Sequence, residues 1–300
     1  MRSTVSVVVP VYNGSRTIQR TIECLLHQTL PPREIIAVDD GSTDGTAAIL
    51  RGFGNRIVYV PKRNGGPASA RNLGIRFASG DYIAFTDSDC YPRRDWLEQL
   101  MGAFDSPAIG GVGGTVRSAD RNPTGEYVDL IGLLDPQPDA SGEIPYIITA
   151  NACFRREALL RAGLFNESFR KAGGEEAELC YRVRQLGLTF RAVPGALVLH
   201  EHRQSLRSLV RTLANYGEGA ALIAELWPER RLANPGRLLL RRLVGCRAWA
   251  RRLNHYLARF GGKKALYFSV LDYLRQPAFL WGYLRGQRRA AASQRDHSLL

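Results

Sequence analysis

The stretch YIAFTDSDC, Tyr82 to Cys90, places two aspartates directly after an apolar run. Residues 82–86 are predicted to form a buried strand. Side chains two residues apart in an extended chain point to the same side, so Asp87 and Asp89 converge and need a cation or hydrogen-bond donors between them. Mg²⁺ and Mn²⁺ favour oxygen ligands, and Mg²⁺ is commonly held by one or two carboxylates plus substrate phosphates. The alternative is a pair of turn or helix-capping aspartates, which is common for so short a motif.

The residues before this stretch alternate between strand and helix patterns. Strands are predicted at 5–9, 34–38, 57–60 and 82–86, with helices after Ser15 and at 67–79. This order and spacing predict an α/β fold with a parallel, doubly wound sheet. Ligands bind such sheets beyond the carboxyl ends of the strands. The polar segments PVYNG, DDGSTD and TDSDC follow three of these strands, so we expect a site at that edge.

Two further segments offer groups that could contact a ligand at this edge. Asp40 could accept a hydrogen bond from a nucleobase imide N–H, although DDGSTDG also suits an Asx-type turn, and both can hold at once. In NGGPASARN, residues 64–72, Gly65 and Gly66 permit close approach of the backbone to a ligand. Arg71 lies about one turn inside the helix and could reach a base or a phosphate, or could be a surface arginine.

The segment GGEEAELCYRVRQLG, residues 173–187, predicts a helix over 175–186. Glu175 and Glu176 fall at its start, where the helix dipole favours an ionised carboxylate. One of them could be a general base, or both could be ordinary acidic residues of a first turn. Elsewhere a helix is predicted at 155–162, strands are predicted at 146–149, 189–193 and 196–199, and residues 117–145 are predicted to be a long loop, either a lid or disordered.

Composition restricts the class of protein and its surroundings. The chain has 300 residues, enough for one large domain or two small ones. Its five cysteines include no CxxC pair, which argues against a disulfide framework and suits a reducing compartment. We expect no signal peptide, because no long apolar segment follows the N-terminus. Residues 265–284 are the best membrane candidate, but Asp272, Arg275 and Pro277 interrupt them, so we do not expect a span.

The positive charge is concentrated in the last third of the chain. Residues 1–200 hold 22 Lys and Arg against 22 Asp and Glu, whereas residues 201–300 hold 19 against 6. Residues 238–260, LLLRRLVGCRAWARRLNHYLARF, interleave arginines with apolar residues and could lie on an anionic membrane surface. A helical subdomain with its arginines in water is the alternative. Nucleic acid would also satisfy the charge, but no nucleic-acid-binding fold signature is present, so we do not expect it as a partner.

Four stretches together resemble the family 2 glycosyltransferases of the GT-A fold. They are VSVVVPVYNG, VDDGSTDGT, NGGPASARNLGIRFASGDYIAFTDSDC and ANACFRREALLRAGLFNESFRKAGGEEAELCYRVRQLG, and they cover roughly residues 5–200. The resemblance implies a Rossmann-like α/β/α sandwich with a mostly parallel central sheet. It implies a nucleotide-sugar-binding half at 1–115, an acceptor-binding half at 116–204 and a basic helical C-terminal region at 205–300.

The resemblance also implies a role for each matching residue. On the donor side, Asp40 would bind the base, Arg71 the base or diphosphate, and Asp87 the ribose or sugar, and further contacts would come from Pro10, Tyr12, Asn13 and Asn64. Asp89 would hold Mg²⁺ or Mn²⁺, and His200 or His202 would be a further metal or diphosphate contact or a strand-end surface histidine. Glu176 stands where the family usually has its catalytic aspartate, with Glu175 on the acceptor side. The Glu175–Glu176 pair departs from the usual Glu-Asp pair by one methylene.

The implied activity is an inverting, metal-assisted transfer from a UDP-, GDP- or dTDP-linked sugar to a hydroxyl of a glycan or lipid-linked acceptor, as in polysaccharide biosynthesis. The expected location is the cytoplasm, with peripheral attachment to the inner face of the cell membrane. One alternative is an inactive GT-A scaffold that binds membrane or nucleic acid, against which the retained Asp87, Asp89 and Glu176 argue. A nicotinamide-dependent oxidoreductase would need GxGxxG at the first helix, where this chain has PVYNGS.

Overall fold

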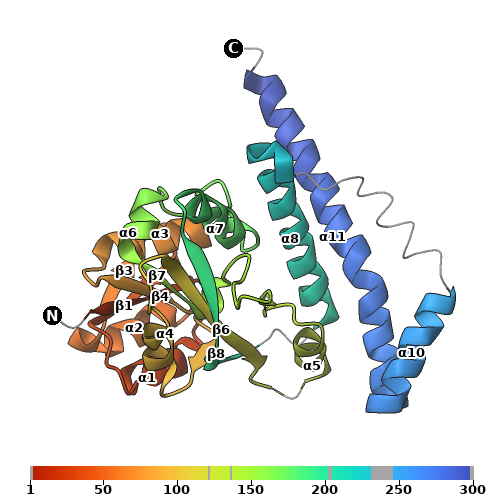
Figure 1. Ribbon diagram of the computed structural model, residues 1–300, viewed down its shortest axis with the longest axis horizontal. Coiled ribbons are helices and arrows are strands. Elements are labelled where there is room, and N and C mark those ends of the chain that lie inside the picture. Colours follow the sequence, from red (N-terminus) through yellow and green to blue (C-terminus); the bar gives the residue numbers. More distant parts are fainter. Residues whose placement is uncertain (1–2, 121, 136, 202–204, 231–245, 298–300) are drawn as a thin grey trace. The chain divides into compact units, whose positions relative to one another are not determined.

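The computed structural model describes residues 3–120, 122–135, 137–201, 205–230 and 246–297. These residues form two units, which Figure 1 shows as an α/β part and a helical part. The α/β unit comprises Met1–Asp120, Val128–Arg170 and Glu175–His202. The helical unit comprises Arg121–Tyr127, Lys171–Gly174 and Arg203–Leu300.

The described part of the α/β unit is built on one eight-stranded sheet with the order β3-β2-β1-β4-β7-β6-β8-β5. The strands are β1 Val5–Val11, β2 Glu34–Asp39, β3 Val58–Pro61, β4 Tyr82–Phe85, β5 Cys90–Pro92, β6 Ile109–Ser118, β7 Ala152–Arg155 and β8 Thr189–His200. Strands β1, β2, β3 and β4 run parallel to one another, and β6 and β8 run parallel to each other. Strand β7 is antiparallel to β4 and β6, and β5 is antiparallel to β8. The predicted mostly parallel α/β fold is therefore confirmed.

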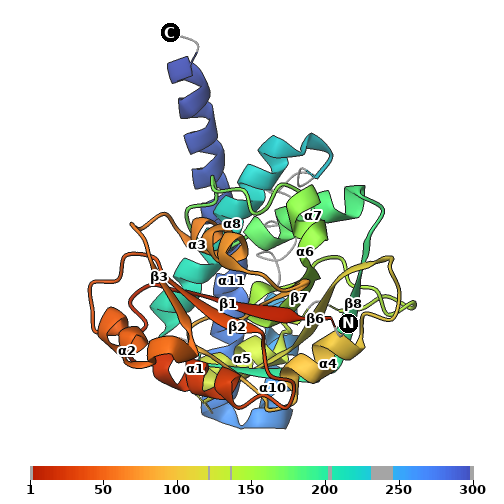
Figure 2. The same ribbon diagram turned by 90° about the vertical axis from the view of Figure 1, so that its left-hand side faces the viewer.

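Helices cover both faces of this sheet. They are α1 Ile18–Leu26, α2 Thr46–Gly52, α3 Pro67–Phe77, α4 Trp96–Gly102, α6 Arg156–Arg161 and α7 Glu175–Gln185. Figure 2 shows α1, α2 and α4 on one face and α3, α6 and α7 on the other. The alternation of strand side chains explains this, because Val7 and Val9 pack with α1 while Val8, between them, packs under α3. Strand β1 therefore packs between two apolar layers, one on each face of the sheet.

Four of the predicted segments differ from the structure. Residues 146–149 do not form a strand, because this segment packs below α7, where the Ile147 N–H donates to the Cys180 Sγ. The predicted strands at 189–193 and 196–199 are one strand, β8, in which an irregularity skips residues between Val193 and Leu197. The loop predicted at 117–145 contains helix α5, Pro123–Leu130. Strands β5, β6 and β7 were not predicted.

The helical unit contains α8 Leu206–Leu226, α10 Cys246–Phe260 and α11 Gly262–His297, with a short 3₁₀ helix at Pro228–Arg230. Helices α8 and α11 run side by side (Figure 1). Glycines permit this approach, since a Cβ on Gly282 would overlap the carbonyl oxygen of Ala214. Asp272 of α11 is buried and accepts hydrogen bonds from the hydroxyls of Tyr127 and Tyr256, both at 2.8 Å.

None of the helices in the described ranges is long and apolar enough to cross a bilayer. Residues 238–245 of the basic stretch and His202 lie outside the described residues. The described remainder of that stretch, from Cys246 onward, forms α10.

Candidate active site

The loops that follow β1, β2 and β4 meet at one edge of the sheet, as the sequence predicted. The Asn13 N–H donates to the Ser42 Oγ at 2.9 Å, and the Asn13 Oδ1 accepts from the Thr43 N–H at 2.8 Å. Asn13 adopts a positive φ of 51°, a conformation that asparagine tolerates better than most residues. Gly14 lies against Ser88, which stands between the two aspartates of the loop after β4. The three polar loops therefore support one another directly.

Asp40 organises the loop between β3 and α3. Its carboxylate is almost fully buried and accepts hydrogen bonds from the Gly65 and Gly66 N–H groups at 2.9 and 2.8 Å and from the Lys62 ammonium at 2.5 Å. The side chain of Asn64 donates to the Asp40 carbonyl. Charge-assisted bonds of this kind are stronger than neutral ones, so Asp40 fixes the backbone of residues 62–66. Lys62 was not singled out from the sequence, although it directly follows β3 at this edge.

Arg71 joins the two halves of the site. Its guanidinium is 3% exposed and donates to the Asp87 Oδ1 through Nη2 and to the Glu175 Oε1 through Nη1, both at 2.9 Å. The Glu175 side chain is 1% exposed. A buried carboxylate is stable only when it is paired, so Arg71 and Glu175 stabilise each other. This link between α3, the loop after β4 and α7 could not be read from the sequence.

Glu176 lies next to this pair at the start of α7. Burial, and then the charge of Glu175, raises the pKa of Glu176 well above its ordinary value of 4.5. Its Oε2 atom is shielded from water and has no hydrogen-bond partner in the structure. A carboxylate with a raised pKa and an oxygen that accepts no hydrogen bond is better suited to take a proton than an ordinary surface glutamate.

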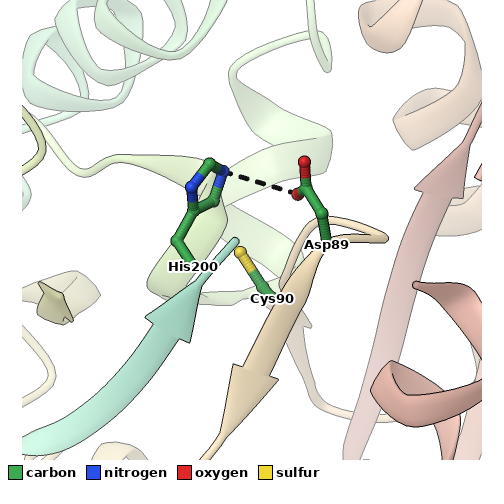
Figure 3. A group of neighbouring side chains, drawn as sticks. All are labelled: Asp89, Cys90 and His200. Atoms are coloured by element: carbon green, nitrogen blue, oxygen red, sulfur yellow. Dashed lines mark ion pairs between the residues drawn. The ribbon is translucent and has the colours of Figure 1, made fainter. Parts of the chain in front are cut away.

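Asp89, Cys90 and His200 form a second cluster at the same edge (Figure 3). The pairing of β5 with β8 places Cys90 directly opposite His200, and His200 Nε2 lies 3.4 Å from Asp89 Oδ1. One ligand atom from each of the three side chains lies within 4.8 Å of the others. From the sequence, His200 could be either a metal or diphosphate contact or a surface histidine at a strand end. The register of β8 with β5 places it next to Asp89.

The donor set of this cluster fits a divalent ion such as Mn²⁺. A carboxylate oxygen and an imidazole nitrogen are suitable ligands for that class of metal. Burial, followed by the charges of Asp89 and Asp87, raises the pKa of the Cys90 thiol well above its ordinary value, and the hard ions Mg²⁺ and Mn²⁺ prefer oxygen or imidazole ligands to sulfur. Asp89 and His200 would therefore hold the ion, and the remaining positions would be open to water or phosphate oxygens.

The remaining predicted donor residues lie near these groups but differ in exposure. Pro10 is partly buried within β1, Tyr12 is 54% exposed in the loop after it, and Asn64 is exposed beside Asp40. Their contacts with a nucleotide, like the roles assigned to the acidic residues, stay predictions.

A cavity of about 200 Å³ lies in the second part of the α/β unit. Its lining includes Ile144, Ile147 and Ile148 together with the charged residues Arg117 and Asp135. The segment from 144 to 148 also contains Tyr146, whose pKa is raised by burial and then by the charge of Glu176. The cavity therefore lies next to the segment that approaches Glu176.

Comparison with known proteins identifies the class. A mostly parallel α/β sheet with its polar loops gathered at one edge, followed by C-terminal helices, matches the GT-A glycosyltransferase structures. The family model "Glycosyl transferase family 2" matches residues 6–162, just over half of the chain. The chain belongs to this family, which confirms the resemblance seen in the sequence.

Two curated relatives illustrate the similarity. A pre-mycofactocin glycosyltransferase of Mycobacterium tuberculosis is 33% identical over 236 residues, which are 75% of this chain and 48% of the relative. A chondroitin synthase of Escherichia coli is 29% identical over 243 residues, 65% of this chain and 34% of the relative. The chain thus spans about half or less of the length of these relatives.

Solved structures share the fold at lower identity. The mannosyltransferase PcManGT from Pyrobaculum calidifontis, in complex with GDP-Man and Mn²⁺, has a TM-score of 0.66 and 21% identity, covering 95% of this chain and 87% of that one. TarS 1-349 of S. aureus, in complex with UDP-GlcNAc, has a TM-score of 0.57 and 18% identity, covering 97% and 92%.

Proposed function

We propose that this chain is a metal-assisted, inverting glycosyltransferase that moves a sugar from a nucleotide-diphosphate sugar to an acceptor hydroxyl. The observation that carries the proposal is the convergence of two groups at one sheet edge: the Asp89–His200 pair, and the Arg71–Glu175 pair with Glu176 beside it. Relatives of the same fold were crystallised with GDP-Man or UDP-GlcNAc, which supports a nucleotide-sugar donor.

The donor side of the reaction depends on charge. Asp40 and the loop that it fixes would face the base, and Asp87, held by Arg71, would face the ribose or the sugar. Asp89 and His200 would hold Mn²⁺ or Mg²⁺, which when bound supplies Lewis-acid neutralisation of the leaving diphosphate. The nucleoside diphosphate leaves with the electron pair of the bond between the anomeric carbon and its phosphate oxygen.

The acceptor side depends on Glu176. Its unpartnered Oε2 would take the proton of the acceptor hydroxyl while that oxygen forms a bond to the anomeric carbon from the opposite face. A single displacement inverts the anomeric centre and requires no covalent intermediate on the enzyme. The cavity lined by Ile144, Ile147 and Ile148 with Arg117 and Asp135 is the proposed acceptor pocket.

The test is a screen of UDP-, GDP- and dTDP-sugars for released nucleoside diphosphate, using the wild type and Glu176→Gln. We expect turnover with one donor class and a loss of about 10²- to 10⁴-fold in Glu176→Gln, the usual contribution of a general base. A wild type that releases nucleoside diphosphate from none of these donors, with and without added acceptor extract, would contradict the proposal.

The melting temperature of Glu176→Gln, measured as a function of pH, shows whether this variant remains folded. A carboxyl whose pKa is raised on folding binds more protons in the folded state, so the free energy of unfolding falls as the pH rises from 4.5 towards the folded pKa. The glutamine variant escapes this loss. We therefore expect its melting temperature to equal that of the wild type at low pH and to exceed it at pH 8, and a lower melting temperature at pH 8 would contradict the burial of this carboxylate.

A further inference from the structure

Helix α11 carries an exposed apolar stripe. Its members are Leu266, Val270, Tyr273, Trp281 and Leu284, whose exposed fractions lie between 38% and 57%. At 3.6 residues per turn these side chains fall within an arc of roughly 80° and extend over about 27 Å of the helix. The opposite side of α11 buries Phe268, Leu271 and Tyr283. The helix is thus apolar on two sides. One side is buried within the described part of the protein, and the other is exposed.

Positive charge surrounds the stripe. Lys263 and Arg288 are exposed, and the helical repeat places them on the same side as the stripe, beyond its two ends. The guanidinium of Arg285 stacks on the Trp281 ring, 4.3 Å from its centroid, but it is also paired with the carboxylate of Glu218 on α8, so its charge is compensated. The only acidic residue in the sequence from 262 to 289 is Asp272, which is buried and bonded to Tyr127 and Tyr256. The exposed side of α11 therefore combines apolar groups with the cations Lys263 and Arg288, and α11 itself places no acidic residue on that side within residues 262–289.

We propose that this face docks the protein onto an anionic lipid surface, with α11 lying in the plane of the interface. An interfacial helix buries aliphatic and aromatic side chains at the headgroup boundary, while its Lys and Arg attract anionic lipids. Tyr and Trp are enriched at that depth. The helix does not have the apolar length to cross a bilayer, which suits a helix that lies on one. The inference is independent of sugar transfer.

Two other occupants fit the observations less well. A second copy that paired through this face would bring Lys263 and Arg288 near their like-charged counterparts with no acid to compensate, which a self-complementary interface disfavours. Nucleic acid would satisfy the cations, but Leu266, Val270 and Leu284 would gain nothing from a phosphate backbone.

The test is flotation of the whole protein with vesicles of phosphatidylcholine mixed with phosphatidylglycerol, and with vesicles of phosphatidylcholine alone, at physiological ionic strength. The stripe variant is Leu266→Asp with Leu284→Asp. The matched control is Phe77→Asp with Leu160→Asp, two equally exposed apolar residues of the α/β unit. No sugar donor is present, so the result does not depend on the proposed transferase activity.

We expect the wild type and the control to float with the mixed vesicles and the stripe variant to lose at least about tenfold in affinity, because each aspartate withdraws a leucine from lipid and adds a like charge at an anionic surface. A wild type that does not float, or a stripe variant that floats as well as the control, overturns the proposal. So does a wild type that is dimeric by sedimentation while the stripe variant is monomeric, or binding to duplex DNA that the stripe substitutions abolish in place of lipid binding.

Discussion

At the scale of single residues, the site is organised by buried charges that stabilise one another. The predicted ligand contacts of Arg71 and Asp40 remain predictions, but both side chains already bond to protein: Arg71 to Asp87 and Glu175, and Asp40 to the loop before α3. Such pairs add little net stability, yet removing one member leaves the other buried and unpaired. The arrangement therefore makes the geometry of the site sensitive to each of its charges.

Arg71→Met should destabilise the protein by about 3–5 kcal/mol, because it removes the cation that compensates the buried charge of the Glu175 carboxylate. The double variant Arg71→Met with Glu175→Gln should regain part of this loss, since the uncompensated charge is then gone. Urea denaturation of the wild type and the three variants, including Glu175→Gln alone, measures the coupling.

The matched control is Arg161→Met, which breaks an exposed pair with Glu157 whose atoms lie 3.6 Å apart. We expect a change of less than about 1 kcal/mol there, the usual range for surface pairs. If Arg71→Met costs no more than Arg161→Met, the buried pair does not hold the site together.

At the scale of elements, the helical unit depends on a close crossing of α8 and α11. Gly217 and Gly282 lie at this crossing, where a Cβ would overlap a carbonyl of the other helix. Small residues at such positions let the two backbones approach, and the apolar side chains around them then pack. Each of these two positions requires glycine because a carbonyl of the neighbouring helix occupies the space that a side chain would need.

Gly282→Ala should therefore destabilise the helical unit by about 1–3 kcal/mol, the usual cost of overpacking, because α8 must move away. Gly262→Ala is the control, since a Cβ at this position of the same helix meets nothing within 4 Å. We expect it to be neutral or slightly stabilising. Far-UV circular dichroism during thermal unfolding measures both, and equal melting temperatures would contradict the close crossing.

The sequence correctly predicted those helices and strands that carry a clear apolar pattern. Strands β1, β2 and β4 and helices α3 and α7 lie within two residues of their predicted bounds, because each packs an apolar run or face into the core. Strand β6, IGGVGGTVRS, was missed because its glycines conceal the strand pattern. Its Gly111 and Gly113 leave room for Ile147, a contact that only the tertiary structure shows. The Asp89–His200 pair was uncertain for the same reason, since it depends on the register of β5 with β8.

At the scale of the whole molecule, the net charge differs between the two parts of the sequence. Residues 1–200 are electrically balanced and contain the candidate site, whereas residues 201–300 hold the positive excess and the helical unit. The site itself draws on loops after β1, β2 and β4, the start of α7 and the end of β8, so no short segment could carry the function. This dispersion is why the joint match of several motifs identified the family when each motif alone was ambiguous.

We propose that Asp89 and His200 hold a divalent ion that the nucleotide donor requires. The most direct measurement is Mn²⁺ binding, from the electron paramagnetic resonance signal of free Mn²⁺, followed by calorimetric titration with UDP and GDP. We compare the wild type with Asp89→Asn, His200→Ala and the control Asp105→Asn, whose side chain is 62% exposed on the same unit.

We expect the wild type and Asp105→Asn to bind Mn²⁺ and then one of the two nucleotides, and we expect chelation of the metal to abolish nucleotide binding. Asp89→Asn and His200→Ala should each weaken Mn²⁺ binding by at least about 10- to 100-fold. Mn²⁺ binding that is unchanged in Asp89→Asn, or nucleotide binding that is equally tight without metal, would contradict this proposal.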